Sequence, residues 1–135
     1  DGENTVVDAE RLYRTHALKT GALITACCEV GGIMTGASGE ARARLREYGK
    51  HLGLAFQIVD DILDVEGSAE ILGKSPGKDA KASKATFPAM WGVGESRRRA
   101  ARCVELSCAA VTGCEPEIRS GHLTTLAQEV LTRRR

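Results

Sequence analysis

Apolar residues recur along the chain at intervals of three and four, which is the spacing of one face of a helix. No stretch alternates apolar and polar positions for long enough to predict a strand. The pattern therefore predicts an all-α fold built from amphipathic helices. We expect helices from near Asp8 to the glycines at 31, 32 and 36, from Ser38-Gly39 past Leu63, from Phe87-Pro88 through Trp91, over residues 95–112, and from Gly121 to the C-terminal arginines.

Residues 66–86 interrupt the helical pattern. This stretch contains glycines at 67, 73 and 77, Pro76 and several lysines, which predicts a long polar loop. A loop of this length inside a compact domain is usually functional or disordered, and we interpret this one as functional.

The composition narrows the class of protein. A chain of 135 residues with 42% hydrophobic residues can build one small core. The 19 Lys+Arg nearly balance the 18 Asp+Glu, so we expect no nucleic-acid partner. The five cysteines form no C-x-x-C pair, which favours reduced core residues and a cytoplasmic location. We also expect no transmembrane segment, because no uninterrupted apolar run approaches the roughly 20 residues that a membrane span needs.

Three carboxylates lie close together near the end of the second predicted helix, at Asp60, Asp61 and Asp64. Asp60 and Asp64 are one turn apart and share a face, and Gln57 lies one turn before them. Like charges at this spacing repel each other, which favours a bound cation, and hard carboxylate oxygens suit Mg²⁺. The alternative is a solvated acidic helix end, because a D-D-x-x-D pattern also arises by chance.

Lysines complete a candidate site for a diphosphate group. Lys19 lies with Thr20 inside the apolar first helix, where a lysine is unexpected unless its ammonium reaches a cavity or a partner. The polar loop supplies Lys74, Lys78, Lys81 and Lys84. For Lys78 and Lys81, an ordinary solvated surface charge is the alternative interpretation.

Three ordered motifs resemble those of the trans-type prenyl diphosphate synthases. They are H-x-x-K-T-G-A-L at 16–23, G-L-A-F-Q-x-x-D-D-x-x-D at 53–64, and L-G-K-x-x-G-K-D-x-x-x-x-K-x-T-F-P at 72–88. The likeness is strongest to short-chain farnesyl and geranylgeranyl diphosphate synthases, and it extends from about Asp8 to the C-terminus. It implies the C-terminal part of an all-α bundle of the isoprenoid synthase type, which is usually a homodimer.

The resemblance also implies roles for individual residues. The substrates would be an allylic diphosphate and isopentenyl diphosphate, with Mg²⁺ bound by Asp60, Asp61 and Asp64. Phe87 stands where tyrosine is common in the family. The residues that the resemblance assigns to substrate binding or catalysis are His16, Lys19, Thr20, Phe56, Gln57, Lys74 and Lys84.

The family's first aspartate-rich motif has no counterpart in this chain. Because the resemblance implies catalysis by two facing carboxylate clusters, we expect residues 1–135 to be inactive alone. A first residue that is Asp rather than Met favours the C-terminal portion of one longer synthase domain. The alternatives are a truncated, non-catalytic subunit that binds and modulates a full synthase, and a helical protein with an incidental acidic patch.

Overall fold

The fold is known from a computed structural model that describes the backbone of residues 2–72, 85–114 and 116–134. Within the first range, side chains are described from residue 9 to residue 70. Every regular element in these ranges is a helix, which confirms the predicted all-α fold. The predicted site residues Lys74 and Lys84, together with Lys78 and Lys81, lie outside the described residues.

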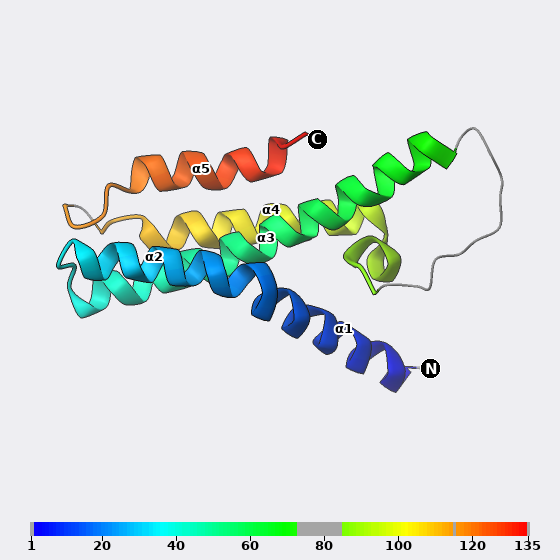
Figure 1. Ribbon diagram of the computed structural model, residues 1–135, viewed down its shortest axis with the longest axis horizontal. Helices are drawn as coiled ribbons and strands as arrows, with labels where there is room; N and C mark the ends of the chain where they lie inside the picture. The colour runs from blue at the N-terminus through cyan, green and yellow to red at the C-terminus, as the bar shows by residue number, and fades with distance from the viewer. Residues whose placement is uncertain (1, 73–84, 115, 135) are drawn as a thin grey trace.

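The helices pack side by side as a bundle around a long central helix (Figure 1). The first three elements, α1, η1 and α2, form one continuous N-terminal rod, because His16 and Ala22, which flank η1, keep helical backbone angles. The long helix α3 runs back along α2 and η1 and then diverges from α1, and α4 and α5 complete the bundle. The elements are α1 (Gly2–His16), the π-helical turn η1 (Ala17–Gly21), α2 (Ala22–Met34), α3 (Gly39–Leu72), α4 (Phe87–Val111) and α5 (Ser120–Thr132).

Two predicted helix boundaries were wrong. The first helix begins at Gly2 rather than near Asp8. A single aspartate inside a helix has a small free-energy cost, which is not enough to end the helix at that residue. The helix α3 continues to Leu72, so residues 66–72 are helical and not part of a loop. The single interior glycine at 67 costs about 1 kcal/mol relative to alanine. An ion pair between Glu66 and Arg97 of α4 supports the extension.

The helix α4 contains the break that the sequence predicts, at Gly92 rather than at Gly94. The Thr86 hydroxyl accepts a hydrogen bond from the Ala89 N–H and so caps the first turn, in which Pro88 has no N–H that would need an acceptor. Gly92 then takes φ 78° and ψ 163°, outside the helical region and in a range that residues with a Cβ rarely adopt. A short helix therefore precedes a long one, as predicted.

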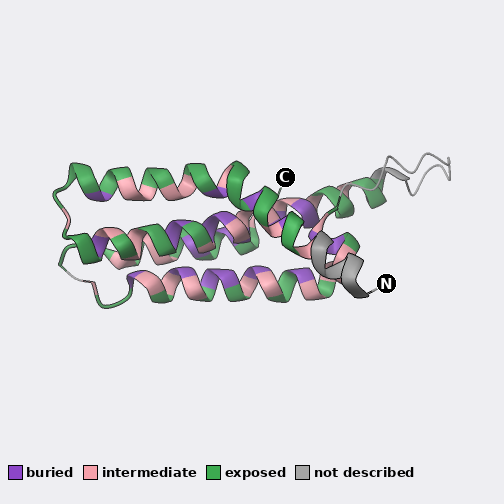
Figure 2. Cartoon of the chain, turned by 90° about the horizontal axis from the view of Figure 1, so that it is seen from below, coloured by how far each residue is buried: buried purple, intermediate pink, exposed green. Residues whose placement is uncertain are grey.

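The core lies between α3, α4 and α5, and Tyr48 is at its centre with no exposed surface. The Tyr48 hydroxyl donates a hydrogen bond of 2.8 Å to the carbonyl of Leu123 on α5. The Ser107 hydroxyl on α4 donates one of 3.0 Å to the carbonyl of Tyr48. Burial raises the pKa of the Tyr48 hydroxyl, so it stays a donor at any physiological pH. Figure 2 shows that buried residues occupy the facing sides of the helices.

An aromatic cluster joins α1 to the first turn of α4. The Tyr13 ring meets Phe87 edge-on at 5.2 Å between ring centroids and Trp91 at 5.9 Å. The Arg99 guanidinium lies 4.3 Å from the Trp91 ring centroid and donates to the Tyr13 hydroxyl. His16 stacks on Phe87 at 5.5 Å. These contacts fix the end of α1 beside the start of α4.

The segment Ala9–Met34 is by length and composition apolar enough to cross a membrane, with a mean hydropathy of 1.3 and 11% of the window buried. A helix of this kind can also belong to the core of a globular protein, so the absence of a transmembrane segment stays a prediction. One face of the segment packs against α3, where Gly21 and Gly32 are buried. Large apolar side chains are exposed elsewhere on it, at Leu18, Leu23, Val30, Ile33 and Met34.

Candidate functional site

The backbones of η1 and α3 meet at a pair of glycines. A Cβ atom added to Gly53 would lie 2.6 Å from the Gly21 Cα, and one added to Gly49 would lie 2.7 Å from the Thr25 Cα. Two non-bonded carbon atoms cannot come as close as either distance, so only glycine allows this approach of the two backbones. The H-x-x-K-T-G motif and the G-L-A-F-Q motif therefore touch at their glycines.

The close approach places Thr20 against Gln57. Gln57 lies one turn beyond Gly53 on α3, and Thr20 precedes Gly21 in η1. The Thr20 hydroxyl donates a hydrogen bond of 3.1 Å to the Gln57 side-chain oxygen. A π-helical turn is rare and occurs frequently at functional sites. Lys19, in the same turn, is exposed to solvent.

The three aspartates of α3 do not converge on one point. Asp61 is only 7% exposed, and its Oδ2 accepts a hydrogen bond of 3.2 Å from the Phe87 N–H. The same oxygen lies 3.2 Å from the His16 Nε2, which makes no aligned hydrogen bond with any described residue. Among the residues that the structure describes, no group of three His, Cys, Asp or Glu side chains could hold a metal ion.

The helix geometry explains why Asp61 separates from its neighbours. Consecutive residues of an α-helix point about 100° apart. Asp60 and Asp64 therefore share the more open side of α3, whereas Asp61 turns towards α1 and α4. The described side chains therefore do not form the expected cluster of three carboxylates, and Asp61 instead accepts from the first residue of α4 and lies against His16 of α1.

Asp60 already interacts with a cation that the sequence did not reveal as a site residue. Arg133, which follows α5, donates from Nη2 to the Asp60 Oδ1 at 2.7 Å. Its guanidinium carbon lies 4.1 Å from the centroid of the Phe56 ring. No periodicity or motif connects Arg133 with Asp60, because 73 residues separate them along the chain.

The carboxylate pair fits Mg²⁺ in its donor chemistry. Mg²⁺ is usually bound by one or two protein carboxylates, with water and substrate phosphates completing six ligands. Asp60 and Asp64 supply hard oxygens one turn apart, and Asp60 attracts a guanidinium in this structure. The buried Asp61, held by the Phe87 N–H, is less suited to direct ligation.

The predicted residues thus gather along the second half of α3. Thr20 contacts Gln57, His16 lies against Asp61, and Phe56 lies under the cation that pairs with Asp60. No described contact brings Lys19 to the carboxylates. Lys74 and Lys84 fall outside the described residues.

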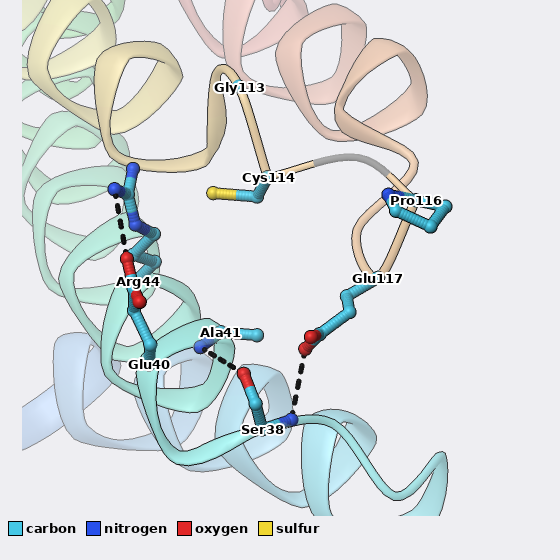
Figure 3. A pocket seen from close by; sticks show the side chains of 8 residues that line it. All are labelled: Ser38, Glu40, Ala41, Arg44, Gly113, Cys114, Pro116 and Glu117. Atoms are coloured by element: carbon cyan, nitrogen blue, oxygen red, sulfur yellow. Dashed lines mark hydrogen bonds and ion pairs between the residues drawn. The ribbon is translucent and has the colours of Figure 1, made fainter.

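A cavity of about 200 Å³ lies at the other end of α3 (Figure 3). There the Ser38 N–H donates to the Glu117 carboxylate at 3.0 Å, which lowers the pKa of that carboxyl. The Ser38 hydroxyl accepts from the Ala41 N–H and caps the first turn of α3. From Glu40 in this cavity to Asp60 is about 30 Å along the helix axis, at 1.5 Å per residue. We interpret this cavity as part of a helix cap rather than of the candidate site.

Comparisons with known proteins identify the family of this chain. Residues 1–115 match the protein family described as Polyprenyl synthetase. The chain is 48% identical over 99 residues to a dimethylallyltranstransferase of Fischerella ambigua (strain UTEX 1903), covering 73% of this chain and 29% of that one. It is 43% identical over 101 residues to the farnesyl diphosphate synthase of Escherichia coli (strain K12), covering 74% and 34% of the two chains.

A solved structure shares the fold. The crystal structure of a protein described as a candidate farnesyl-diphosphate synthase from Marinomonas sp. MED121 superposes with a TM-score of 0.68 at 30% sequence identity. The match covers 89% of this chain and 39% of that one. The chain thus spans about a third of the length of the curated relatives it matches. The chain belongs to the polyprenyl synthetase family.

Proposed function

We propose that this chain is the C-terminal part of a prenyltransferase that joins an allylic diphosphate to isopentenyl diphosphate. The observation that carries the proposal is the glycine contact between the two motifs, which sets Thr20 against Gln57. One turn beyond Gln57, Asp60 begins the carboxylate pair. A polar contact and two hard anionic ligands thus follow one another along α3, as a magnesium-bound diphosphate requires.

The proposed reaction breaks the C–O bond between the allyl group and its diphosphate. The bonding electron pair leaves with the diphosphate, the double bond of isopentenyl diphosphate attacks the allylic cation to form the new C–C bond, and the resulting cation gives a proton to the released diphosphate. Mg²⁺, when bound, stabilises the negative charge that develops on the leaving diphosphate.

The residues of this chain hold and orient the leaving group. Asp60 and Asp64 are the proposed metal ligands, and Asp61 positions their helix through the Phe87 N–H. Thr20 is oriented by Gln57, and the exposed ammonium of Lys19 is available to an anionic group. The half-buried Phe56 ring supplies an apolar wall, which keeps water away from the allylic cation.

The exposed apolar side chains of α2 favour a protein surface over this helix. In a full synthase, that surface would belong to the remaining two thirds of the chain or to the second subunit of a homodimer. In the alternative function, a complete synthase would bind the same face of a non-catalytic subunit. Both proposals predict that Leu23 and Met34, which are 67% and 82% exposed in this chain, become protected in the functional assembly.

Replacing Asp60 with alanine in the natural full-length protein tests the metal assignment. We expect turnover in saturating Mg²⁺ to fall by about 100-fold or more, because the ligand acts mostly in the transition state. Asp64→Ala should cost less, since Asp64 is the outer member of the pair. Glu70→Ala, which removes an exposed carboxylate from the same helix, is the matched control and should keep its activity. Near-full activity of Asp60→Ala would show that Asp60 is not a metal ligand.

A further inference from the structure

Arg133 occupies one of the two oxygens of the Asp60 carboxylate, the proposed metal ligand. Its Nη2 lies 2.7 Å from the Asp60 Oδ1, and its guanidinium lies over the Phe56 ring at 4.1 Å. A dication bound to the same oxygen would lie within about 2.1 Å of it. A guanidinium and Mg²⁺ on the same carboxylate repel each other and compete for its negative charge, so each contact weakens the other.

The contact is also easily displaced. The side chains of Arg133 and Asp60 are 34% and 41% exposed, and ion pairs with this exposure are weak. The Arg133 Nη1 is buried and has no hydrogen-bond partner among the described residues, which opposes the bound position. Arg133 follows the last helical residue, Thr132, with φ −55° and ψ 133°, so its backbone is not restrained by a helix.

Resting on the proposed function, we propose that Arg133 is an internal counterion of the metal site. In the metal-free protein its guanidinium neutralises Asp60 and fixes the end of α5 against α3. Metal binding at Asp60 displaces the guanidinium and releases residues 131–134 from α3. Because coupling between two binding events is reciprocal, Arg133 lowers the metal affinity of Asp60, and the metal loosens the end of α5.

The exchange would keep the negative charge of Asp60 paired with a cation, whether or not metal is bound. Without metal, Asp60 and Asp64 repel each other one turn apart on α3, and Arg133 relieves the repulsion. The same arginine also covers the Phe56 ring, which the proposed function places beside the substrate. Release of Arg133 therefore opens the metal site and uncovers the apolar wall in one step.

Binding of Mn²⁺ to the natural full-length protein tests the proposal, measured by electron paramagnetic resonance without substrate. Mn²⁺ takes the same hard oxygen ligands as Mg²⁺. We expect Arg133→Gln to bind Mn²⁺ about 3- to 10-fold more tightly than the unmodified protein, which is the effect of losing a partly exposed ion pair and a stacked cation. Arg134→Gln, which removes the neighbouring exposed charge, is the control and should change the affinity by less than about 2-fold.

Hydrogen exchange provides the second readout. Mn²⁺ should speed exchange of the amides of residues 131–134 in the unmodified protein, and it should leave them unchanged in Arg133→Gln, where they are already released. Equal Mn²⁺ affinity of Arg133→Gln and the unmodified protein would overturn the counterion proposal. If Asp60→Ala abolished Mn²⁺ binding in that case, the proposed function would stand. Mn²⁺ binding that is unaffected by Asp60→Ala would overturn the metal assignment and the counterion proposal together.

Discussion

Replacing Gly53 with alanine separates the two contributions of this glycine, one to helix stability and one to helix approach. In a helix interior, alanine is favoured over glycine by about 1 kcal/mol. The new Cβ would lie 2.6 Å from the Gly21 Cα, whereas carbon atoms in contact prefer about 3.5–4.0 Å. The two helices must therefore separate by about 1 Å, because backbone atoms on both sides cannot rotate away.

The expected result is a net loss of stability. Overpacking of this kind costs about 1–3 kcal/mol, and a clash between two backbones belongs at the upper end. After the helical gain of about 1 kcal/mol, we expect Gly53→Ala to lower the free energy of unfolding by about 1–2 kcal/mol. The same separation would lengthen the 3.1 Å contact of Thr20 with Gln57 beyond hydrogen-bonding distance.

Gly31→Ala is the matched control. Gly31 lies within α2, has no atom within 4 Å of an added Cβ and keeps an ordinary helical φ. We expect this variant to be more stable than the original by about 0.4–1 kcal/mol. Urea denaturation of both variants, followed by circular dichroism, measures the difference at equal slope. A Gly53→Ala protein as stable as Gly31→Ala would refute the close approach of η1 and α3.

Two further predictions concern buried groups. Asp61→Ala should lower the free energy of unfolding by about 1–3 kcal/mol more than Asp61→Asn, because only asparagine keeps an acceptor for the buried Phe87 N–H. Equal urea midpoints for the two variants would contradict that role. Burial raises the pKa of the Cys103 thiol from its ordinary 9.0 to about 11, so iodoacetamide at pH 8 should modify the exposed Cys27 quickly and Cys103 only after unfolding. Because the unfolded chain loses the Cys103 proton at a lower pH than the folded protein, the free energy of unfolding is at its full value below pH 9.0. It falls as the pH rises from 9.0 towards 11. Fast modification of Cys103 in the folded protein, followed by mass spectrometry, would show that the thiol is accessible.

The helical period predicted the α-helices but not the π-helical turn η1, because burial of one face per helix leaves a direct trace in the sequence. It failed at the end of α3, where the ion pair of Glu66 with Arg97 supports a helix through a glycine. That pair depends on the packing of α3 against α4, which local pattern does not contain. Helix ends are decided by such tertiary contacts as much as by local propensity.

The candidate site was predictable where it depends on spacing along one helix. The shared face of Asp60 and Asp64 follows from the four-residue interval alone. The partners of Asp61 and Asp60 could not be predicted, because His16, Phe87 and Arg133 come from distant parts of the chain. The position of Arg133 depends on the direction in which α5 returns along α3, and no residue pattern encodes that direction.

The π-helical turn η1 has a consequence for the length of the N-terminal rod. A π turn is an α-helix with one additional residue, and removing that residue would rotate all that precedes it by about 100°. Tyr13 and His16 would then leave Phe87, although Gly21 would still meet Gly53. The one additional residue therefore sets the rotation of α1 relative to η1, so that α1 faces α4 while η1 faces α3. A deletion between residues 17 and 21 would therefore break the contacts of α1 with α4 even if every remaining side chain of the turn kept its identity.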